Sequence, residues 1–280
     1  MAIALSFFDE RFIMSSMQTL VDVHCHLGQS VRGSMSADGE RLCALLRQAG
    51  VTHAVAFSIE ACYGGIDIGN AYTLGEVERQ EMLSAMVVAH PHHRASSERW
   101  VNASVANPDV VGVKLHPALG QYDVTSSAVM RLMDEVVAPS GLSVLSHVGN
   151  ETSQVPVDKY LELASRFPGV RFIAAHLGVG VLGIRERSID AWVEKPLENV
   201  WFDMGTLRAF TTGAVEGLLD AVGEDRVCFG TDAPLYVPAP FSRLLETLDI
   251  TEEARRKIAC RNALAALPRL AGKAGAGPQG

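Results

Sequence analysis

The stretch VDVHCHLG (residues 21–28) places two imidazoles one residue apart in an otherwise apolar run. Successive side chains of an extended chain point to opposite faces, so we expect His24 and His26 on one face and Val23 and Cys25 on the other. A single buried histidine is most often a hydrogen-bonded core residue. A pair at this spacing at a strand end instead favours a metal ion, because neutral imidazole is the commonest protein ligand for zinc-type ions.

Through the rest of the chain, short apolar runs alternate with amphipathic helical patterns. This alternation is typical of βα units that build a parallel sheet. The predicted strands are residues 20–27, 52–59, 83–89, 110–116, 143–148, 170–176, 200–203 and 227–230. The predicted helices are residues 38–49, 70–80, 96–106, 128–137, 157–167, 184–193, 212–222, 241–248 and 252–267. No linker separates two halves, so we predict a single-domain (β/α)8 TIM barrel over residues 20–268, after an N-terminal extension (1–19) and before a flexible tail (269–280).

Composition narrows the class of protein. The chain has 280 residues, is 48% hydrophobic and carries a formal net charge of −8 without a basic run, which argues against nucleic-acid and anionic-membrane partners. Its five cysteines lack finger or CxxC spacing and predict reduced thiols. No apolar window is long enough for a membrane span, and the start lacks the pattern of a signal peptide. We therefore expect a cytoplasmic protein with a small-molecule partner.

Polar residues gather where the predicted strands end. In a barrel, the carboxyl ends of all strands open onto one face, and catalytic groups collect there. Four strands ending in histidine would be a costly set of buried polar groups without a ligand, whereas clustered His and Asp are the usual ligands of zinc and related ions. The residues brought together in this way are His24, His26, Lys114, His116, His147, His176 and Asp232.

These stretches also resemble a known family. The segments VDVHCHLG, VVGVKLHP, LSVLSHVGN, FIAAHLG and DRVCFGTDAP occur in the order found in the amidohydrolase superfamily, in its amidohydrolase-2 branch of TIM-barrel metal-dependent hydrolases and decarboxylases. The resemblance implies that His24, His26 and Asp232 bind a divalent metal, with His147 as a further ligand and His176 as a ligand or a catalytic group. It is also compatible with a homodimer.

A single metal ion, zinc first with manganese or iron as alternatives, is the arrangement we favour. Zinc lowers the pKa of bound water to about 7, Asp232 can then accept the water proton, and His176 can polarise the substrate oxygen. Lys114 and His116 are expected to contact the substrate. In the two-metal alternative His147 and His176 hold a second ion, and a carbamylated Lys114 bridges the pair, as in related enzymes.

The leading functional hypothesis is a metal-dependent hydrolase of a small amide, lactone or ester. The second is a non-oxidative decarboxylase of an unsaturated or aromatic acid, because the amidohydrolase-2 branch includes such enzymes. An iron-dependent oxygenase and a non-catalytic binding protein remain as further alternatives. We expect the Gly-rich segment within residues 60–80 to be a mobile lid. His53 should be a structural residue at the opposite face of the barrel. Arg208 should be a surface residue that could bind a carboxylate.

Overall fold

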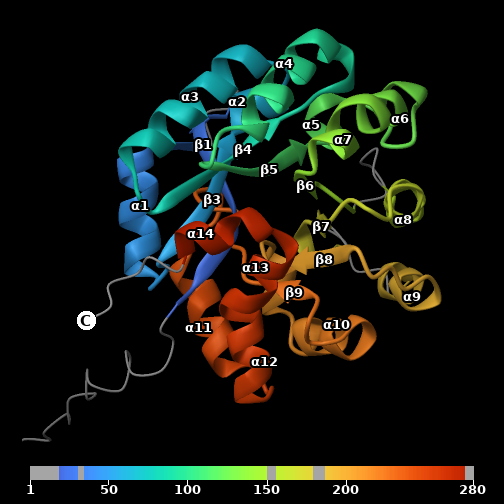
Figure 1. Ribbon diagram of the computed structural model, residues 1–280. Helices are drawn as coiled ribbons and strands as arrows, with labels where there is room; N and C mark the ends of the chain where they lie inside the picture. The colour runs from blue at the N-terminus through green and yellow to red at the C-terminus, as the bar shows by residue number, and fades with distance from the viewer. Residues whose placement is uncertain (1–18, 31–34, 150–155, 179–186, 275–280) are drawn as a thin grey trace, which may run out of the picture.

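A computed structural model describes residues 19–30, 35–149, 156–178 and 187–274, and these form one curled sheet with helices around it (Figure 1). Eight strands run parallel in chain order, and the short β2 pairs antiparallel with the end of β1. This confirms all eight predicted strands and adds β2. The strands are β1 Val21–Gln29, β2 Ser36–Ala37, β3 His53–Ser58, β4 Leu83–Val88, β5 Val110–Leu115, β6 Ser143–Ser146, β7 Phe172–Ala174, β8 Val200–Asp203 and β9 Val227–Cys228.

The residues that follow β9 close the sheet into a barrel. The amide of Val23 donates to the carbonyl of Phe229 (3.1 Å), and the amide of His26 donates to the carbonyl of Ala233 (2.7 Å). In the opposite direction the amide of Asp232 donates to the carbonyl of His24 (2.9 Å). The seam between the first and the last strand therefore runs through the residues predicted to form the site, and the fold is the expected (β/α)8 barrel.

Helices cover the outside of the barrel. The longer ones are α1 Gly39–Gln48, α3 Ile66–Arg79, α4 Arg94–Val105, α8 Val157–Arg166, α9 Arg187–Glu194, α10 Ala214–Val222 and α11 Ala239–Thr247. The shorter ones are α2 Ile59–Cys62, α5 Pro117–Gly120, α6 Ser127–Leu132, α7 Ala138–Ser140, α12 Glu252–Arg256, α13 Asn262–Ala266 and α14 Ala271–Ala274. The 3-10 and π turns are η2 Pro91–His93, η3 Met133–Val137, η4 His176–Gly178, η5 Leu207–Phe210, η6 Lys257–Arg261 and η7 Pro268–Leu270. No helix among the described ranges is long and apolar enough to cross a membrane.

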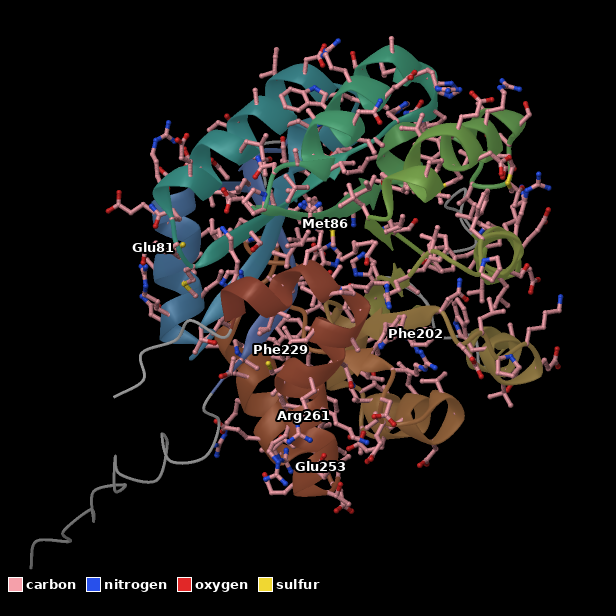
Figure 2. All side chains as sticks on the ribbon, viewed as in Figure 1. Glu81, Met86, Phe202, Phe229, Glu253 and Arg261 are labelled. Atoms are coloured by element: carbon pink, nitrogen blue, oxygen red, sulfur yellow. The ribbon has the colours of Figure 1, made fainter. Side chains whose placement is uncertain are left out.

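The barrel interior is filled by apolar side chains at its amino end. Val55, Met86 and Ile173 form one buried cluster with Ala266 and Leu270 from the C-terminal segment, and Figure 2 labels Met86 within it. Figure 1 shows α13 and α14 in front of the ring of strands. Because this segment packs against the amino ends of the strands, we look for the site at their carboxyl ends.

Two boundary expectations are corrected by these helices. Residues 269–274 are helical and Leu270 is fully buried, so the expected tail begins too early. Within residues 60–80 the chain forms the helices α2 and α3, so the helix predicted over residues 70–80 is confirmed but begins earlier, at Ile66. Asn70 fixes α3 to the sheet, because its amide nitrogen donates to the Val88 carbonyl (3.0 Å) and its amide oxygen accepts from the Val88 amide (2.8 Å). Residues 1–18 and 275–280 of the predicted extension and tail lie outside the described residues.

Strand β1 does not alternate as simply as its sequence suggests. Asp22 pairs with Ala54 of β3 and Cys25 pairs with Ala56, so two residues of β1, Val23 and His24, stand opposite one residue of β3. Val23 consequently belongs to the interior cluster, whereas Cys25 packs on the outside. The prediction that both face away from the histidines was wrong for Val23, because a β-bulge changes the direction of every side chain beyond it.

Candidate metal centre

Three electron-pair donors converge at the carboxyl end of the barrel. Asp232 Oδ1 lies 2.9 Å from His26 Nε2 and 3.4 Å from His24 Nε2. All three residues are buried, and one ligand atom of each lies within 4.8 Å of the others. Asp232 Oδ1 nevertheless has no hydrogen-bond partner. A buried carboxylate oxygen that faces two imidazole nitrogens and makes no hydrogen bond fits a divalent cation, for which two His and one acidic residue are a common ligand set.

Asp203 at the end of β8 orients the first of these imidazoles. Its Oδ2 accepts from His24 Nδ1 at 2.9 Å, which fixes the proton of neutral His24 on Nδ1 and leaves the lone pair of Nε2, 3.4 Å from Lys114 Nζ, as the ligand atom. Its Oδ1 accepts from the amides of His176 (3.1 Å) and Gly205 (2.8 Å). His24, His176 and Asp203 also lie close enough to hold an ion. Because hydrogen bonds already occupy His24 Nδ1 and both Asp203 oxygens, the group with Asp232 is the better candidate.

His176, His147 and His116 form a row of rings beside the three donors. His176 Nδ1 donates to the Gly205 carbonyl (2.6 Å), so its Nε2 accepts from His147 Nδ1 (3.0 Å) when His176 is neutral. The rings of His147 and His116 stack with centroids 4.5 Å apart. His116 Nδ1 accepts from the Leu119 amide (3.3 Å), which leaves the proton of neutral His116 on Nε2. Among the described residues His147 is not part of a group with metal-ligand spacing.

Burial controls the charge of the site. The pKa values of His24, His26, His116 and His147 are held well below the usual range, in each case mainly by desolvation. Neutral imidazole is the form that binds metals. Desolvation also raises the pKa of Asp232 to about 7 in the metal-free protein.

Backbone geometry at the site is unusual for residues with side chains. His176 (φ 62°) and Asp232 (φ 59°) both adopt the left-handed region, where such strain is most often kept for function. Two glycines allow the close packing around them. A Cβ on Gly230 would lie 2.9 Å from Asp203 Cβ, and one on Gly205 would lie 3.1 Å from the Asp232 amide.

Lys114 is a fully buried cation next to the donor group. Its Nζ lies 3.4 Å from His24 Nε2 and 4.5 Å from the centroid of the Phe57 ring. Desolvation lowers its pKa to about 8, partly offset by the nearby Asp232 and other anionic groups. No carboxylate among the described residues lies within ion-pair distance of it, so its charge has no direct counterion.

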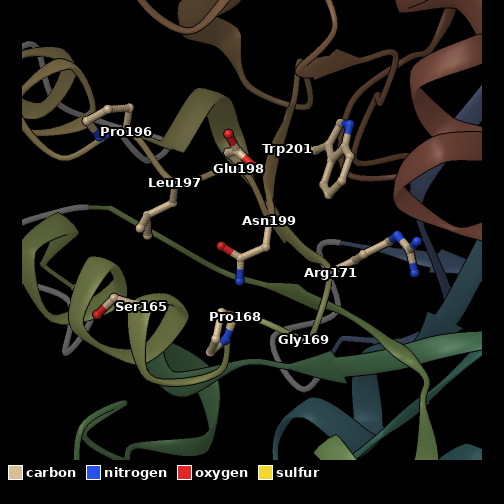
Figure 3. Close-up of a pocket in the computed structure, with 9 residues that line it drawn as sticks. All are labelled: Ser165, Pro168, Gly169, Arg171, Pro196, Leu197, Glu198, Asn199 and Trp201. Carbon is tan, nitrogen blue, oxygen red and sulfur yellow. The ribbon is translucent and has the colours of Figure 1, made fainter.

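The opposite end of the barrel holds an open cavity of about 500 Å³. Figure 3 shows Arg171, Asn199 and Trp201 around it, at the amino ends of β7 and β8. His53 also lies at an amino end, where its Nε2 pairs with Ser84 Oγ (2.9 Å) as a structural residue would. Since barrel chemistry belongs to the carboxyl ends, neither feature marks the site.

Comparison with known proteins identifies the family of this chain. The family model described as Amidohydrolase (Amidohydro_2) matches residues 21–269, which includes every strand of the barrel. The chain belongs to the amidohydrolase family. A search of curated proteins finds no match to this amidohydrolase.

Solved structures share the fold of this amidohydrolase at low sequence identity. A 2,6-dihydroxybenzoate decarboxylase from Rhizobium has a TM-score of 0.71 at 16% identity and covers 90% of this chain and 99% of its own. A dihydroxybenzoic acid decarboxylase from a Polaromonas species, with bound manganese and 2-nitroresorcinol, has a TM-score of 0.69 at 14% identity. The match covers 90% of this chain and 97% of the decarboxylase. A 4-oxalomesaconate hydratase from Rhodopseudomonas palustris has a TM-score of 0.67 at 14% identity. The match covers 92% of this chain and 98% of the hydratase.

Sequence reasoning overlooked two carboxylates of the amidohydrolase site. Asp203 could have been found, because it ends the run VWFD and the carboxyl end of a strand was the criterion applied to the histidines. Asp22 gives no such signal, since it lies near the start of β1 and reaches the site only through the bulge. Arg208 follows β8, with two guanidinium nitrogens, Nε and Nη1, that are buried without a partner, so it is less of a surface residue than expected.

Proposed function

We propose that this amidohydrolase is a divalent-metal-dependent decarboxylase of a small unsaturated or aromatic carboxylic acid. The observation that carries the proposal is Lys114, a fully buried cation beside His24, His26 and Asp232 that has no carboxylate within ion-pair distance among the described residues. A buried cation is costly unless it is paired, and the ammonium group is a compact point charge suited to a carboxylate. A substrate carboxylate would complete this site.

The residues that would hold the ion are His24, His26 and Asp232. Two imidazoles and a carboxylate suit zinc, and manganese also accepts such ligands. Three protein ligands leave coordination positions open for the substrate or water. A bound ion would supply a Lewis acid that stabilises negative charge on substrate oxygens. His147 and His176 lie next to this group and remain candidates for a further ligand and for contacts with the substrate.

Each side chain around the ligand group has its own role in the proposed reaction. Lys114 binds the departing carboxylate, and His116 donates its Nε2 proton in a hydrogen bond to a substrate oxygen. When the bond to CO2 breaks, its electron pair stays on the substrate carbon, and the carboxyl group of Asp232 gives that carbon a proton. The Asp232 carboxylate regains a proton from water once the product has left. Burial of Lys114 and both ligand histidines keeps bulk water from the reacting carbon.

Hydrolysis of a small amide, lactone or ester is the second candidate. The same Asp232 favours it, because a carboxylate beside an open metal position can accept a proton from water. The two reactions differ in their need for Lys114, since an amide or lactone brings no negative charge to it.

The experiment compares the two reactions on one preparation. Protein reloaded with zinc or manganese is assayed for CO2 release on dihydroxybenzoates and related aromatic acids, and for acid release on lactones, esters and amides. We expect CO2 release without net consumption of water, loss of that activity in Lys114→Met, and no turnover of the matching carboxamides. Turnover of uncharged lactones or amides by both the unsubstituted protein and Lys114→Met would reject decarboxylation in favour of hydrolysis.

A further inference from the structure

We infer that Asp22 is a positioning residue, which together with Thr231 holds the β1 bulge that turns His24 and His26 into the barrel. The inference rests on the proposed metal site but does not depend on which reaction takes place there. Among the described residues, Asp22 is the buried carboxylate near the site that neither belongs to the candidate ligand group nor contacts the rings of its histidines.

The bulge decides the direction of the two histidines. Val21 and Val23 both pack in the interior cluster, so strict alternation would place His24 and His26 outside, under the helices. One extra residue in β1 reverses the alternation, and Cys25 and Leu27 pack outside instead. His26 thereby faces inward, where its ring lies 4.5 Å from that of Phe57. The convergence on Asp232 therefore depends on the extra residue in β1.

A bulge removes one residue from the ladder, and here Asp22 replaces the missing partner. The amide of His24 donates to Asp22 Oδ1 (3.0 Å) instead of to a carbonyl of β3. A buried amide without a partner destabilises the fold, so the carboxylate stabilises the bulged conformation over the regular strand. An aspartate at this position thus selects the inward direction of the histidines.

The same carboxylate reaches across the barrel seam to the segment that carries Asp232. Asp22 Oδ2 accepts from Thr231 Oγ1 (2.6 Å), and Asp22 Oδ1 accepts from the Thr231 amide (3.2 Å). Thr231 Oγ1 in turn accepts from the Ala233 amide (3.2 Å), on the far side of Asp232. The Asp232 amide donates to the His24 carbonyl (2.9 Å). Asp22 and Thr231 consequently fix the ligand atoms of β1 and of the Asp232 segment relative to each other.

The test uses two pairs of variants that differ in hydrogen bonding more than in size. Asp22→Leu removes the acceptor, whereas Asp22→Asn keeps an amide oxygen for the two backbone amides and an NH2 group that can donate to Thr231. Thr231→Val removes the hydroxyl, whereas Thr231→Ser keeps it. Ser143→Ala is the control, because it removes a buried hydroxyl that donates to the Ala266 carbonyl (2.7 Å) at the amino end of the barrel.

Two readouts are measured on each variant beside its unfolding midpoint. The first is the dissociation constant for zinc and manganese. The second is amide hydrogen exchange of the metal-free protein at His24, Thr231, Asp232 and Ala233, with the β5 and β6 amides as internal reference. Removal of groups that orient metal ligands typically costs 10–100-fold in metal affinity, so we expect at least a tenfold loss in Asp22→Leu and Thr231→Val. The same variants should exchange faster at the four seam amides, while Asp22→Asn, Thr231→Ser and Ser143→Ala stay close to the unsubstituted protein in both readouts.

The inference is overturned if Asp22→Leu and Thr231→Val lower only the unfolding midpoint and leave metal affinity and seam exchange unchanged. Should Asp22→Leu fail to fold, the two Thr231 variants decide the question by the same readouts. If the unsubstituted protein binds no metal, the proposed function fails, whereas the exchange measurement on metal-free protein still decides the positioning role of Asp22.

Discussion

Asp203→Asn is the substitution whose effect the geometry defines most closely. The carboxylate serves two neighbours in fixed directions: Oδ2 accepts from His24 Nδ1 (2.9 Å) and Oδ1 accepts from two backbone amides. If asparagine keeps its oxygen toward the amides, its NH2 group faces His24 Nδ1 and drives the imidazole proton onto Nε2, the ligand atom. If the amide group turns round, two buried backbone amides lose their acceptor. Either orientation weakens the metal site while the size of the side chain stays the same.

The expected magnitude follows from the hydrogen bond that is lost. A hydrogen bond to a charged group contributes about 1.5–3 kcal/mol, and each 1.4 kcal/mol is about a factor of ten in a dissociation constant. We therefore predict that Asp203→Asn weakens zinc or manganese binding by about 10–100-fold, which agrees with the usual effect of such orienting partners. Calorimetric titration of chelator-stripped protein measures this value, and circular dichroism confirms that the fold is kept.

Asp220→Asn is the matched control, because it makes the same change on an exposed position of α10 and should leave the metal affinity unaltered. Unchanged metal affinity in Asp203→Asn would show that Asp203 does not orient His24 toward an ion, and the reasoning from hydrogen bonds to ligand geometry would fail.

Three further predictions follow from the same structure. His24→Ala and Asp232→Asn should each abolish metal-dependent turnover with little change in the far-ultraviolet circular dichroism, whereas retained turnover and metal content in both would contradict the ligand assignment. Dialysis against a chelator should remove activity, and zinc or manganese alone should restore it; full activity in metal-free protein would count against the site. Desolvation lowers the pKa of His53 to about 4 from its ordinary 6.5, so the neutral form stabilises the fold above about pH 6.5, and as much as about 3 kcal/mol is lost as the pH falls from 6.5 toward 4. In denaturant titrations His53→Gln should be less stable than the unsubstituted protein at pH 7, with a difference that shrinks by pH 5; a difference independent of pH would contradict this assignment.

The barrel could be predicted from the sequence because apolar strands and amphipathic helices alternate through the whole chain. The same regularity placed His24, His26 and Asp232 together, since the two histidines lie on the first strand, Asp232 follows the last, and the carboxyl ends share one face. Periodicity did not reveal the β1 bulge, because the extra residue changes which side chains face inward without changing the composition of the run.

Other misses came from contacts that no local pattern encodes. The helix predicted over residues 70–80 forms as α3 but begins earlier, at Ile66, although Gly65 and Gly69 favour a loop there, and two hydrogen bonds of Asn70 hold it to Val88. In the same way the glycines near the C-terminus indicate a tail, but Leu270 packs into the amino end of the barrel and keeps residues 268–274 helical. Tertiary packing overrides local propensity in both cases.

The most direct measurement of the central claim is anomalous diffraction from crystals of this amidohydrolase, stripped of metal and reloaded with zinc or manganese, with data collected on both sides of the metal absorption edge. The account predicts an anomalous peak about 2.0–2.2 Å from His24 Nε2, His26 Nε2 and Asp232 Oδ1. The account is contradicted if neither metal gives a peak between these three atoms, or if the peak lies elsewhere in the barrel.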